Sequence, residues 1–259
     1  MRIATFNING IRARIEAVTA WLTESSPDVA LLQEIKSQDE SFPRGLIEDL
    51  GYAVHTHGQK GFNGEAILSK LPVEDVQRGL PGDTDDVQAR WIEATVIGTR
   101  ALRVCCLYLP NGNPAPGPKY DYKLGWMDRL HTRAKALLAT EEPVVMAGDY
   151  NVIPQAEDAH RPDAWRQDAL FLPQSRAALR RIQNLGFTDA FRACVQGPGH
   201  YSFWDYQSLA WDRGDGFRID HLLLSPQAAD LLNDSWIETE VRGREKPSDH
   251  TPVWIDLAA

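Results

Sequence analysis

The segment that most constrains this chain is Pro143–Pro154, because it places polar side chains directly after a buried strand. The apolar run 144–147 is typical of a strand that is covered on both faces, and Gly148 lets the backbone approach a neighbour closely. Asp149 and Asn151 follow two residues apart, so in extended backbone their side chains leave the same face. Their oxygens suit a hard cation and an activated water. Gly, Asp and Asn are equally typical of a simple turn, so this segment alone leaves both interpretations open.

Other predicted strands also lead into acid or amide side chains, which favours a site over a turn. The predicted first strand, 2–10, carries Asn7 and Asn9 at its end, again two residues apart. The apolar run 29–32 leads into Glu34. For Glu34, the alternative interpretation is a solvated surface charge. The repetition of this pattern predicts one composite site.

The C-terminal part of the sequence adds an aspartate and a histidine to this site. The predicted strand 215–224 carries Asp220, with Arg218 two residues earlier on the same face. Flanking prolines hold Asp249 and His250 in rigid, extended backbone. Histidine is the side chain best suited to proton transfer near neutral pH. A site built where two similar halves of the chain meet would collect these side chains with those that end the earlier strands.

Length and composition limit the class of protein. A chain of 259 residues with 43% apolar residues and 8 Trp is sufficient for one sizeable core, so we expect a single domain over 1–259. Cys105 and Cys106 are adjacent in a predicted strand and point to opposite faces, which does not suit a disulfide framework. No stretch approaches the roughly 18 consecutive apolar residues of a membrane span, and no signal-peptide pattern is present. We therefore expect a soluble cytoplasmic protein.

The net charge of −9 argues, taken alone, against a nucleic-acid partner, because phosphate binding usually leaves a basic footprint. A bound divalent cation would reverse the sign of the charge locally. The sequence also offers basic side chains that we expect to form a local rim: Lys36, Lys119, Lys123, Arg213, Arg242, Arg244 and Lys246.

Between these strands, periodicity predicts helices, a hairpin and a long loop. Amphipathic helices are predicted over about 120–140 and 174–184. The predicted strands 90–97 and 102–109 form a hairpin across Gly98 and Thr99, so the sheet is not purely parallel. The segment 151–172 has little periodicity and is predicted to be a surface loop with aromatic and basic tips that could hold substrate.

Three further groups of residues have a simple structural interpretation. His55 and His57 share a strand face but lack a third ligand nearby, so surface histidines are favoured over a zinc pair. The acidic residues in 83–86 indicate a solvated turn. The aromatic segment 201–206 indicates either core or a surface on which bases stack.

Taken together, the motifs resemble the exonuclease III family of the endonuclease/exonuclease/phosphatase superfamily. They occur in the family's order over nearly the whole chain, as 6–10, 33–36, 108–111, 148–151, 201–206, 218–220 and 248–250. The resemblance implies an α/β fold of the DNase I type, a four-layer αββα sandwich with two mixed β-sheets packed face to face. It also implies Mg²⁺-dependent or Mn²⁺-dependent hydrolysis of double-stranded DNA by a monomer, 5′ to abasic sites and at 3′ ends.

The resemblance also implies the metal ligands and the groups that activate water. Glu34 resembles the main metal ligand, supported by Asn7, Asn9 and Asp249. Asp149 resembles the residue that orients or deprotonates the attacking water. The other site residues have implied roles as well: Asn151 near the metal and the phosphate, Tyr108 at the phosphate or leaving oxygen, His250 held by Asp220, and Lys36 and Asn111 at phosphate contacts. Whether Asp149 or His250 is the general base stays open.

Recognition of an abasic nucleotide requires a pocket too tight for a normal nucleotide and lined by flat apolar side chains. Four residues are candidates for its walls: Phe203, Trp204, Phe217 and Ile219. The alternative is that they are ordinary core residues. The chain departs from the family at Glu65, where a small or apolar residue is usual, and at Gly214, where many members have asparagine.

Two rival functions remain at this point. One keeps the fold and changes the substrate to a phosphoester other than DNA. The other is a catalytically silent nucleic-acid-binding module. Such a module would not need Asp149, Glu34 and Asp249 together, because clustered carboxylates repel phosphate unless a cation is present.

Overall fold

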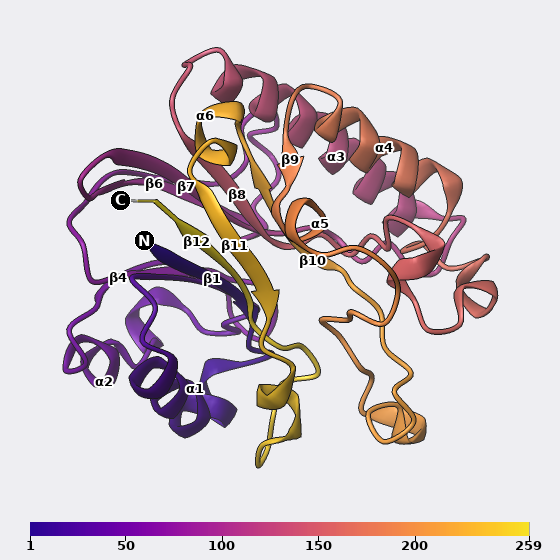
Figure 1. The fold of residues 1–259 in the computed structure, drawn as a ribbon, viewed down its shortest axis with the longest axis horizontal. Coiled ribbons are helices and arrows are strands. Elements are labelled where there is room, and N and C mark those ends of the chain that lie inside the picture. The colour runs from indigo at the N-terminus through magenta and orange to yellow at the C-terminus, as the bar shows by residue number, and fades with distance from the viewer. Residues whose placement is uncertain (259) are drawn as a thin grey trace.

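The computed structural model describes residues 1–258 and shows two β-sheets packed face to face, with helices on both outer faces (Figure 1). Each sheet has six strands. The first has the order β11 (Leu232–Ile237), β12 (Val253–Leu257), β1 (Arg2–Asn7), β2 (Val29–Gln33), β4 (Glu65–Ser69), β3 (Ala53–His57). The second has the order β5 (Val73–Arg78), β6 (Trp91–Ile97), β7 (Ala101–Tyr108), β8 (Val144–Asp149), β10 (Asp220–Leu224), β9 (Thr188–Asp189). The predicted four-layer αββα sandwich is confirmed.

The two sheets repeat one topology. In each, a single parallel pair is joined by a crossover helix: β1 and β2 through α1 (Ile11–Ser25), and β7 and β8 through α3 (Pro118–Leu138). Antiparallel strands flank both pairs, β12 and β4 in the first sheet, β6 and β10 in the second. Both sheets are therefore mixed, and the expected pattern of two similar halves is present in the fold.

Apolar side chains fill the space between the sheets and the space under each helical layer. Ile3 and Leu31 of the first sheet and Val104 and Val145 of the second are fully buried between the sheets. Alternate residues of the same strands face the helices, as the two-residue period of a strand requires. Burial of each such side chain contributes about 1.5–3 kcal/mol, so the sheets form a rigid base for the side chains at their ends.

The helices begin slightly earlier than the sequence indicates. α3 and α4 (Pro173–Gln183) both start at a proline, which fits the first helical turn because that position needs no N–H donor. The remaining elements are short: η1 (Asp39–Ser41), α2 (Arg44–Glu48), η2 (Ala156–Asp158), η3 (Pro162–Trp165), α5 (Ala190–Cys194), η4 (Gln207–Leu209), α6 (Pro226–Ala229) and η5 (Thr239–Gly243). No helix within residues 1–258 is both long enough and apolar enough to cross a membrane.

The strand predicted for 215–224 is shorter than expected, because β10 begins only at Asp220. The preceding residues are held by a loop instead: the backbone N–H of Arg218 donates to the Asp158 carbonyl, and its guanidinium pairs with Asp158 and Asp189. Arg218 therefore does not share a strand face with Asp220. Phe217 forms isolated bridges with Ala159 and Phe203.

Two charged or polar groups expected on the surface are partly enclosed. The Asp86 carboxylate accepts hydrogen bonds from Tyr122 and Arg129 of α3, so the 83–86 turn is anchored rather than fully solvated. His57 is half-buried, and its Nδ1 lies 3.0 Å from the Trp91 carbonyl oxygen. Both contacts hold edge segments of the sandwich.

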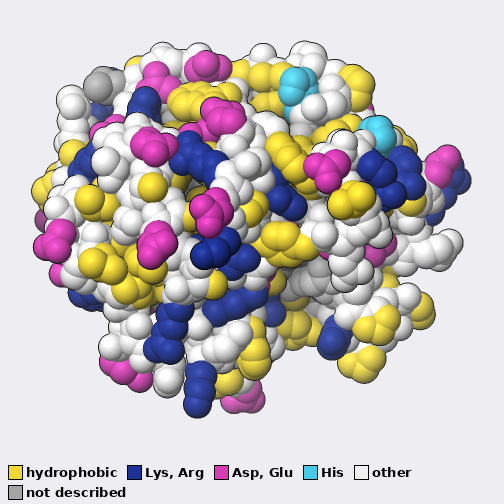
Figure 2. Space-filling view, turned by 90° about the horizontal axis from the view of Figure 1, so that it is seen from below, with side chains coloured by type: hydrophobic (Ala, Val, Ile, Leu, Met, Phe, Trp, Pro, Cys, Tyr) yellow, Lys and Arg dark blue, Asp and Glu magenta, His cyan; other side chains and the backbone are white. Residues whose placement is uncertain are grey.

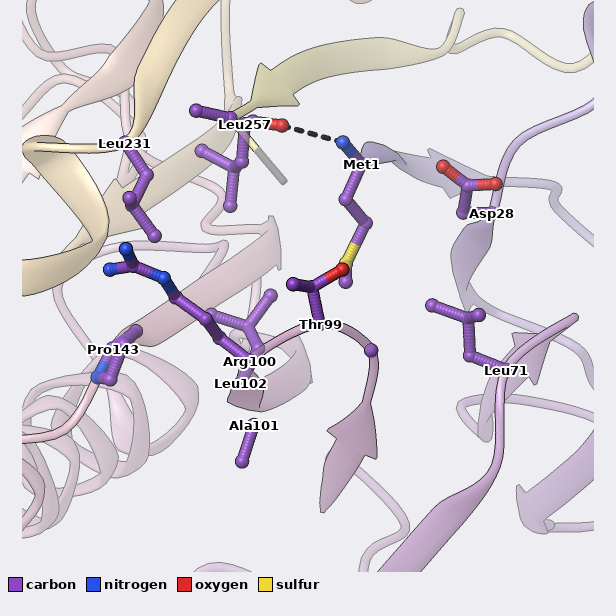
Figure 3. A pocket seen from close by; sticks show the side chains of 12 residues that line it. Met1, Asp28, Leu71, Thr99, Arg100, Ala101, Leu102, Pro143, Leu231 and Leu257 are labelled. Atoms are coloured by element: carbon purple, nitrogen blue, oxygen red, sulfur yellow. Dashed lines mark hydrogen bonds between the residues drawn. The ribbon is translucent and has the colours of Figure 1, made fainter.

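The starts of the parallel strands surround an apolar cavity of about 220 Å³ (Figure 3). The Met1 ammonium at its rim donates to the Leu257 carbonyl oxygen at 2.5 Å and lies 3.6 Å from Asp256. The first and last strands are thus tied together at this end. The polar side chains singled out by the sequence lie at the other end of the strands.

Candidate active site

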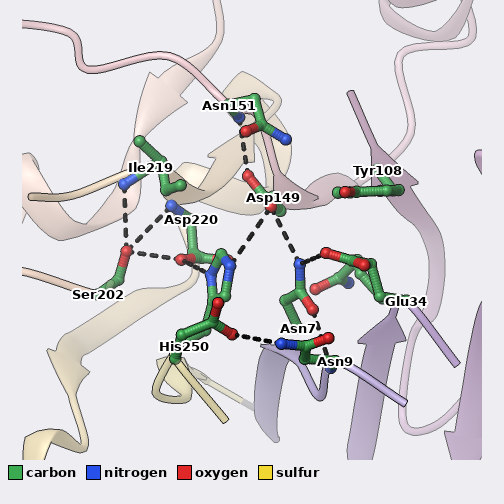
Figure 4. A network of polar contacts seen from close by, with 12 residues as sticks. Asn7, Asn9, Glu34, Tyr108, Asp149, Asn151, Ser202, Ile219, Asp220 and His250 are labelled. Carbon is green, nitrogen blue, oxygen red and sulfur yellow. Dashed lines mark hydrogen bonds and ion pairs between the residues drawn. The ribbon is translucent and has the colours of Figure 1, made fainter. Parts of the chain in front are cut away.

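The polar strand ends of both sheets meet in one network, and Asn7 joins its two halves (Figure 4). Asn7 is fully buried at the end of β1. Its Nδ2 donates to Glu34 Oε1 in the same sheet and to Asp149 Oδ2 in the opposite sheet, both at 3.0 Å. One amide therefore fixes the distance between the two carboxylates that the sequence singled out.

The residues that follow the strands reach the site through turns rather than extended backbone. Asn9, Glu34 and Asn151 have φ of 49°, 50° and 47°. The Asn9 N–H donates to Asn7 Oδ1 at 3.1 Å, and the Asn151 N–H donates to Asp149 Oδ1 at 2.8 Å. The assumption of an extended backbone after Asp149 was wrong: the segment forms a turn, and the turn brings Asp149 and Asn151 to the same cavity.

Gly148 is required by the close approach of the neighbouring strand. A Cβ at this position would lie 1.9 Å from the Leu107 carbonyl oxygen of β7. Any larger residue would push β8 away from β7 and move Asp149 with it.

A chain of hydrogen bonds holds the site imidazole. Ser202 Oγ donates to Asp220 Oδ2 at 2.6 Å, and His250 Nδ1 lies 2.9 Å from the same oxygen. The other ring nitrogen, Nε2, lies 3.7 Å from Asp149 Oδ2. Asp220 thereby sets the orientation of the ring. Ser202 was not singled out in the sequence, because its role depends on two segments that meet only in the fold.

Burial and neighbouring charges shift the pKa values of this chain of groups. Burial disfavours the charged imidazole, but the Asp220 charge and hydrogen bond outweigh it and raise the pKa of His250. Burial also raises the pKa of Asp149, although the nearby His250 opposes that shift. A raised pKa makes Asp149 a stronger base than an exposed aspartate.

Glu34 has the opposite electrostatic character. Burial acts to raise its pKa, but the hydrogen bond and charge of Lys36 outweigh that effect and lower it. Lys36 Nζ lies 2.9 Å from Glu34 Oε2 and also donates to Asn9 Oδ1. Asn9 Nδ2 in turn donates to Asp249 Oδ1 at 3.0 Å. Glu34 is therefore ionised at neutral pH and connected to Asp249.

The opposite wall of the site consists of hydrogen-bond donors. Asn111 Nδ2 donates to Asn151 Oδ1 at 3.1 Å, and Asn151 Nδ2 donates to the Leu109 carbonyl oxygen at 2.9 Å. Burial, with the charges of Glu34 and Asp149, raises the pKa of Tyr108 well above its usual value. Tyr108 therefore keeps its hydroxyl proton.

A cavity of about 260 Å³ opens beside these groups and is lined by both polar and apolar side chains. The polar residues include Glu34, Tyr108, Asn111, Asp149, Asn151, Asp249 and His250. The apolar residues include Trp165, Leu170, Phe203, Phe217 and Ile219. Three of the four residues predicted for an apolar pocket therefore line one cavity with the polar network.

Trp204 is the residue of that set that does not line the cavity. It follows Phe203 directly, so its side chain leaves the opposite side of the segment. Its ring makes edge contacts with Trp211 and Tyr201, at centroid distances of 4.9 Å and 6.2 Å. The prediction of Trp204 as a pocket wall was wrong, and the core interpretation holds for it.

Trp165 and Leu170 were missed as individual residues, although the sequence indicated that their loop could hold substrate. Trp165 packs edge-on against Phe217 with ring centroids 4.5 Å apart. The only indication in the sequence was a tryptophan in a predicted surface loop. Its partner could not be predicted, because Phe217 lies 52 positions later in the sequence.

Two groups of side chains could hold a metal ion. Ligand atoms of Asp149, Asp220 and His250 lie within 4.8 Å of one another, but Asp220 and His250 already bind each other. The second group is Glu34, Asp149 and Asp249, which line the open cavity together with Asn151. Because these donors are oxygens and Glu34 is ionised, the second group fits a hard divalent cation better.

Lys and Arg side chains gather in a band on the face where α1 and the 205–214 and 239–247 segments lie (Figure 2). Lys119, Arg213 and Lys246 of the expected rim are exposed. Arg242 is 6% exposed and stacks on Tyr206 and Trp211. Lys123 is fully buried, and burial lowers its pKa to about 7. The rim prediction was wrong for these last two residues.

Comparisons with known proteins agree with this arrangement. A model of the Endonuclease/Exonuclease/phosphatase family matches residues 4–250. Exodeoxyribonuclease III of Haemophilus influenzae is 36% identical, over 99% of this chain and all of the relative. Two solved structures match this chain over the full length of both proteins. The Neisseria 3′ phosphatase NExo, bound to a product DNA hairpin, has 34% identity and a TM-score of 0.96. An AP endonuclease from Archaeoglobus fulgidus has 36% identity and a TM-score of 0.95.

Proposed function

The chain belongs to the Endonuclease/Exonuclease/phosphatase family, and we propose that it is a Mg²⁺-dependent DNA-repair phosphodiesterase. It cleaves double-stranded DNA 5′ to abasic sites and removes nucleotides or blocking groups from 3′ ends, as a single-domain monomer. The observation that carries the proposal is the buried Asp149 between Asn7 and His250, at the edge of a cavity that apolar side chains also line. The relatives named above support DNA as the substrate.

Glu34 is the main metal ligand in this proposal, with Asn7 and Asp249 beside it and Asp149 and Asn151 facing the same ion. The donors are carboxylate and amide oxygens, which is the set that Mg²⁺ prefers, and Mn²⁺ could replace it. The bound cation supplies charge stabilisation for the phosphate in the transition state. Lys36 keeps Glu34 ionised and therefore ready to bind the ion.

The chain's own residues hold the water and the phosphate. Asp149 orients the attacking water and accepts its proton, and its raised pKa suits that role near neutral pH. His250, oriented by Asp220, donates from Nε2 toward the phosphate oxygens. The Tyr108 hydroxyl and the amides of Asn111 and Asn151 donate to the non-bridging or leaving oxygen.

The cavity accepts the bare sugar of an abasic nucleotide against its apolar side chains. Phe203, Phe217 and Ile219 line it together with Trp165, whose ring packs against Phe217. An extruded sugar without a base fits such a confined space better than a complete nucleotide does. Damage is therefore recognised directly beside the groups that cleave.

The test is cleavage of a duplex with one abasic site, with Mg²⁺ and with a chelator, by the wild type and by Asp149→Asn. We expect cleavage only with the metal. Asp149→Asn should fold and bind the duplex normally but lose at least about 10³-fold in rate. The matched control is the exposed Asp163→Asn, which should cleave like the wild type.

Cleavage by Asp149→Asn within about tenfold of the wild-type rate would remove Asp149 as the water-activating residue. A phosphoinositide serves as the competing substrate. If it is turned over and the abasic duplex is not, the proposed DNA substrate is wrong.

A further inference from the structure

We propose that Lys123 is a positioning residue whose buried amino group aligns Asn111 and Asn151 for the phosphate. Lys123 lies on the inner side of α3 and is fully buried. Its Nζ donates to the Asn151 carbonyl oxygen at 2.6 Å and to the Asn111 carbonyl oxygen at 3.0 Å. One side chain therefore joins the loop after β7 to the loop after β8. This inference rests on the proposed phosphodiesterase function.

The two asparagines are placed by this link as a pair. Asn111 Nδ2 donates to Asn151 Oδ1, and Asn151 Nδ2 donates to the Leu109 carbonyl oxygen. Each carboxamide nitrogen carries two hydrogens, so each retains one donor beyond the bond it makes here. Both residues line the cavity with Asp149. The second hydrogen of each carboxamide can therefore reach a phosphate in the cavity only while Lys123 keeps the two loops in their present relative position.

The backbone is shaped around the Lys123 side chain. Gly112 follows Asn111 in the loop after β7 with φ +89°, and a Cβ there would lie 2.6 Å from Lys123 Cδ. The stem of Lys123 thus occupies the space that any other residue at position 112 would need. The bonds from Lys123 therefore depend on the close packing of its side chain against Gly112, so the lysine is held in one position.

The amino group of Lys123 indicates a role beyond packing. Lys123 takes part in no ion pair within residues 1–258, which means that no carboxylate oxygen there lies within 4.0 Å of its Nζ. The acidic groups whose charges act on it are Asp149 and Asp168. A buried charge without a direct partner is costly, and a neutral apolar residue would fill the same space more cheaply. The Lys123 amino group has enough N–H donors for both carbonyls in either protonation state, and the bonds are stronger when it carries a proton.

The experiment compares Lys123→Met with the wild type on the abasic duplex, at a temperature well below both unfolding transitions. We expect kcat to fall at least about tenfold while KM changes less than about threefold, because the asparagines act on the transition state. Lys135→Met is the control, since Lys135 is an exposed lysine of the same helix. It should leave both constants unchanged.

A double-mutant cycle separates positioning from a general loss of stability. If Lys123 acts through the asparagines, adding Lys123→Met to Asn151→Ala should cost less than about threefold. Lys123→Gln, which retains one donor, should lie between wild type and Lys123→Met. An unchanged kcat in folded Lys123→Met, or a full additional loss in the Asn151→Ala background, would overturn the proposal.

Loss of folding in both Lys123 variants would also overturn it, because the role would then be structural. In each of these cases the wild type and Lys135→Met still cleave the abasic duplex. Failure of the proposed function is different, because the wild type itself would then be inactive.

Discussion

At the scale of single residues, Glu65 is the group that least fits its surroundings. It lies in β4 opposite Gln33 and His57 and is fully buried. Neither carboxylate oxygen has a hydrogen-bond partner within the described residues. Burial raises its pKa well above the usual value, and the charge of Glu34 adds to that shift. This is the position at which the sequence already departs from the family pattern.

Glu65 should make the protein less stable as the pH rises. Its pKa is higher in the folded than in the unfolded state, so between the two values the folded protein binds more protons. Stability therefore falls with increasing pH across that window and does not recover above it. We predict that Glu65→Gln removes this loss.

The measurement is thermal unfolding of Glu65→Gln and wild type between pH 4 and pH 8. The unfolding temperatures of the two proteins should differ little near pH 4. Above that pH the variant should unfold at a higher temperature than the wild type, by about 2–4 °C for each kcal/mol of stability that the substitution restores. Exposed Glu74→Gln is the control and should follow the wild type. A constant difference at all pH values would mean that the Glu65 carboxyl does not titrate as described.

The sequence predicted which polar residues end the strands, but it did not predict which residues contact each other. Buried runs ending in Asn7, Glu34 and Asp149 carry a local pattern that predicts strand ends with polar side chains. Ser202 and Lys123 carry no such pattern, because each acts on partners from distant segments. Hydrogen bonds between remote segments are a property of the fold, so these roles could not be assigned before it.

At the scale of elements, the central strands and the helices α3 and α4 were predictable, whereas the edge strands β5, β9 and β11 and the start of β10 were not. The alternation in 215–224 is consistent with one long strand. Arg218 interrupts it, because its buried guanidinium pairs with Asp158 and Asp189 instead of entering a ladder. Burial of an arginine with two carboxylates outweighs local strand propensity. The result is an irregular segment that places Phe217 in the cavity wall.

We predict that Phe217→Ala narrows the preference for abasic over undamaged duplex, because truncation enlarges the cavity. The fold should remain intact, with a loss in stability of about 3–5 kcal/mol at most. The measurement is the ratio of kcat/KM on the two substrates. Phe191→Ala is the matched control, since Phe191 is equally buried but does not line the cavity. An unchanged ratio in folded Phe217→Ala would exclude Phe217 from substrate selection.

At the scale of the whole molecule, the net charge of −9 and the basic band of Figure 2 have to be considered together. Some charged residues lie far from the band and pair with each other, as Glu93 does with Arg103 and Arg133. The basic side chains of the band remain on one face. Net charge is a sum over the whole chain and does not say where the charges lie, so a chain with a negative total can still carry a band of basic side chains on one face.

Binding of abasic duplex should weaken steeply with salt despite the negative net charge. Each DNA phosphate that a basic side chain neutralises contributes about −0.9 to the slope of log K against log salt concentration. Lys246→Gln should make that slope shallower by about 0.9, since Lys246 is exposed on this face. Lys135→Gln is the control. Affinity that does not depend on salt would contradict a DNA-binding role for the band.

The pairing of β1 with β12 has a consequence for how the protein is made. A chain emerges from the ribosome N-terminal end first, at about 5–20 residues per second. β1 therefore appears long before its antiparallel neighbour β12. Asn9 and its partner Asp249 are separated by 240 residues. Until residues 249–257 have left the ribosome, β1 has an open edge and the site has no imidazole. The candidate site is therefore incomplete in the nascent chain until β12 and the residues just before it have been made.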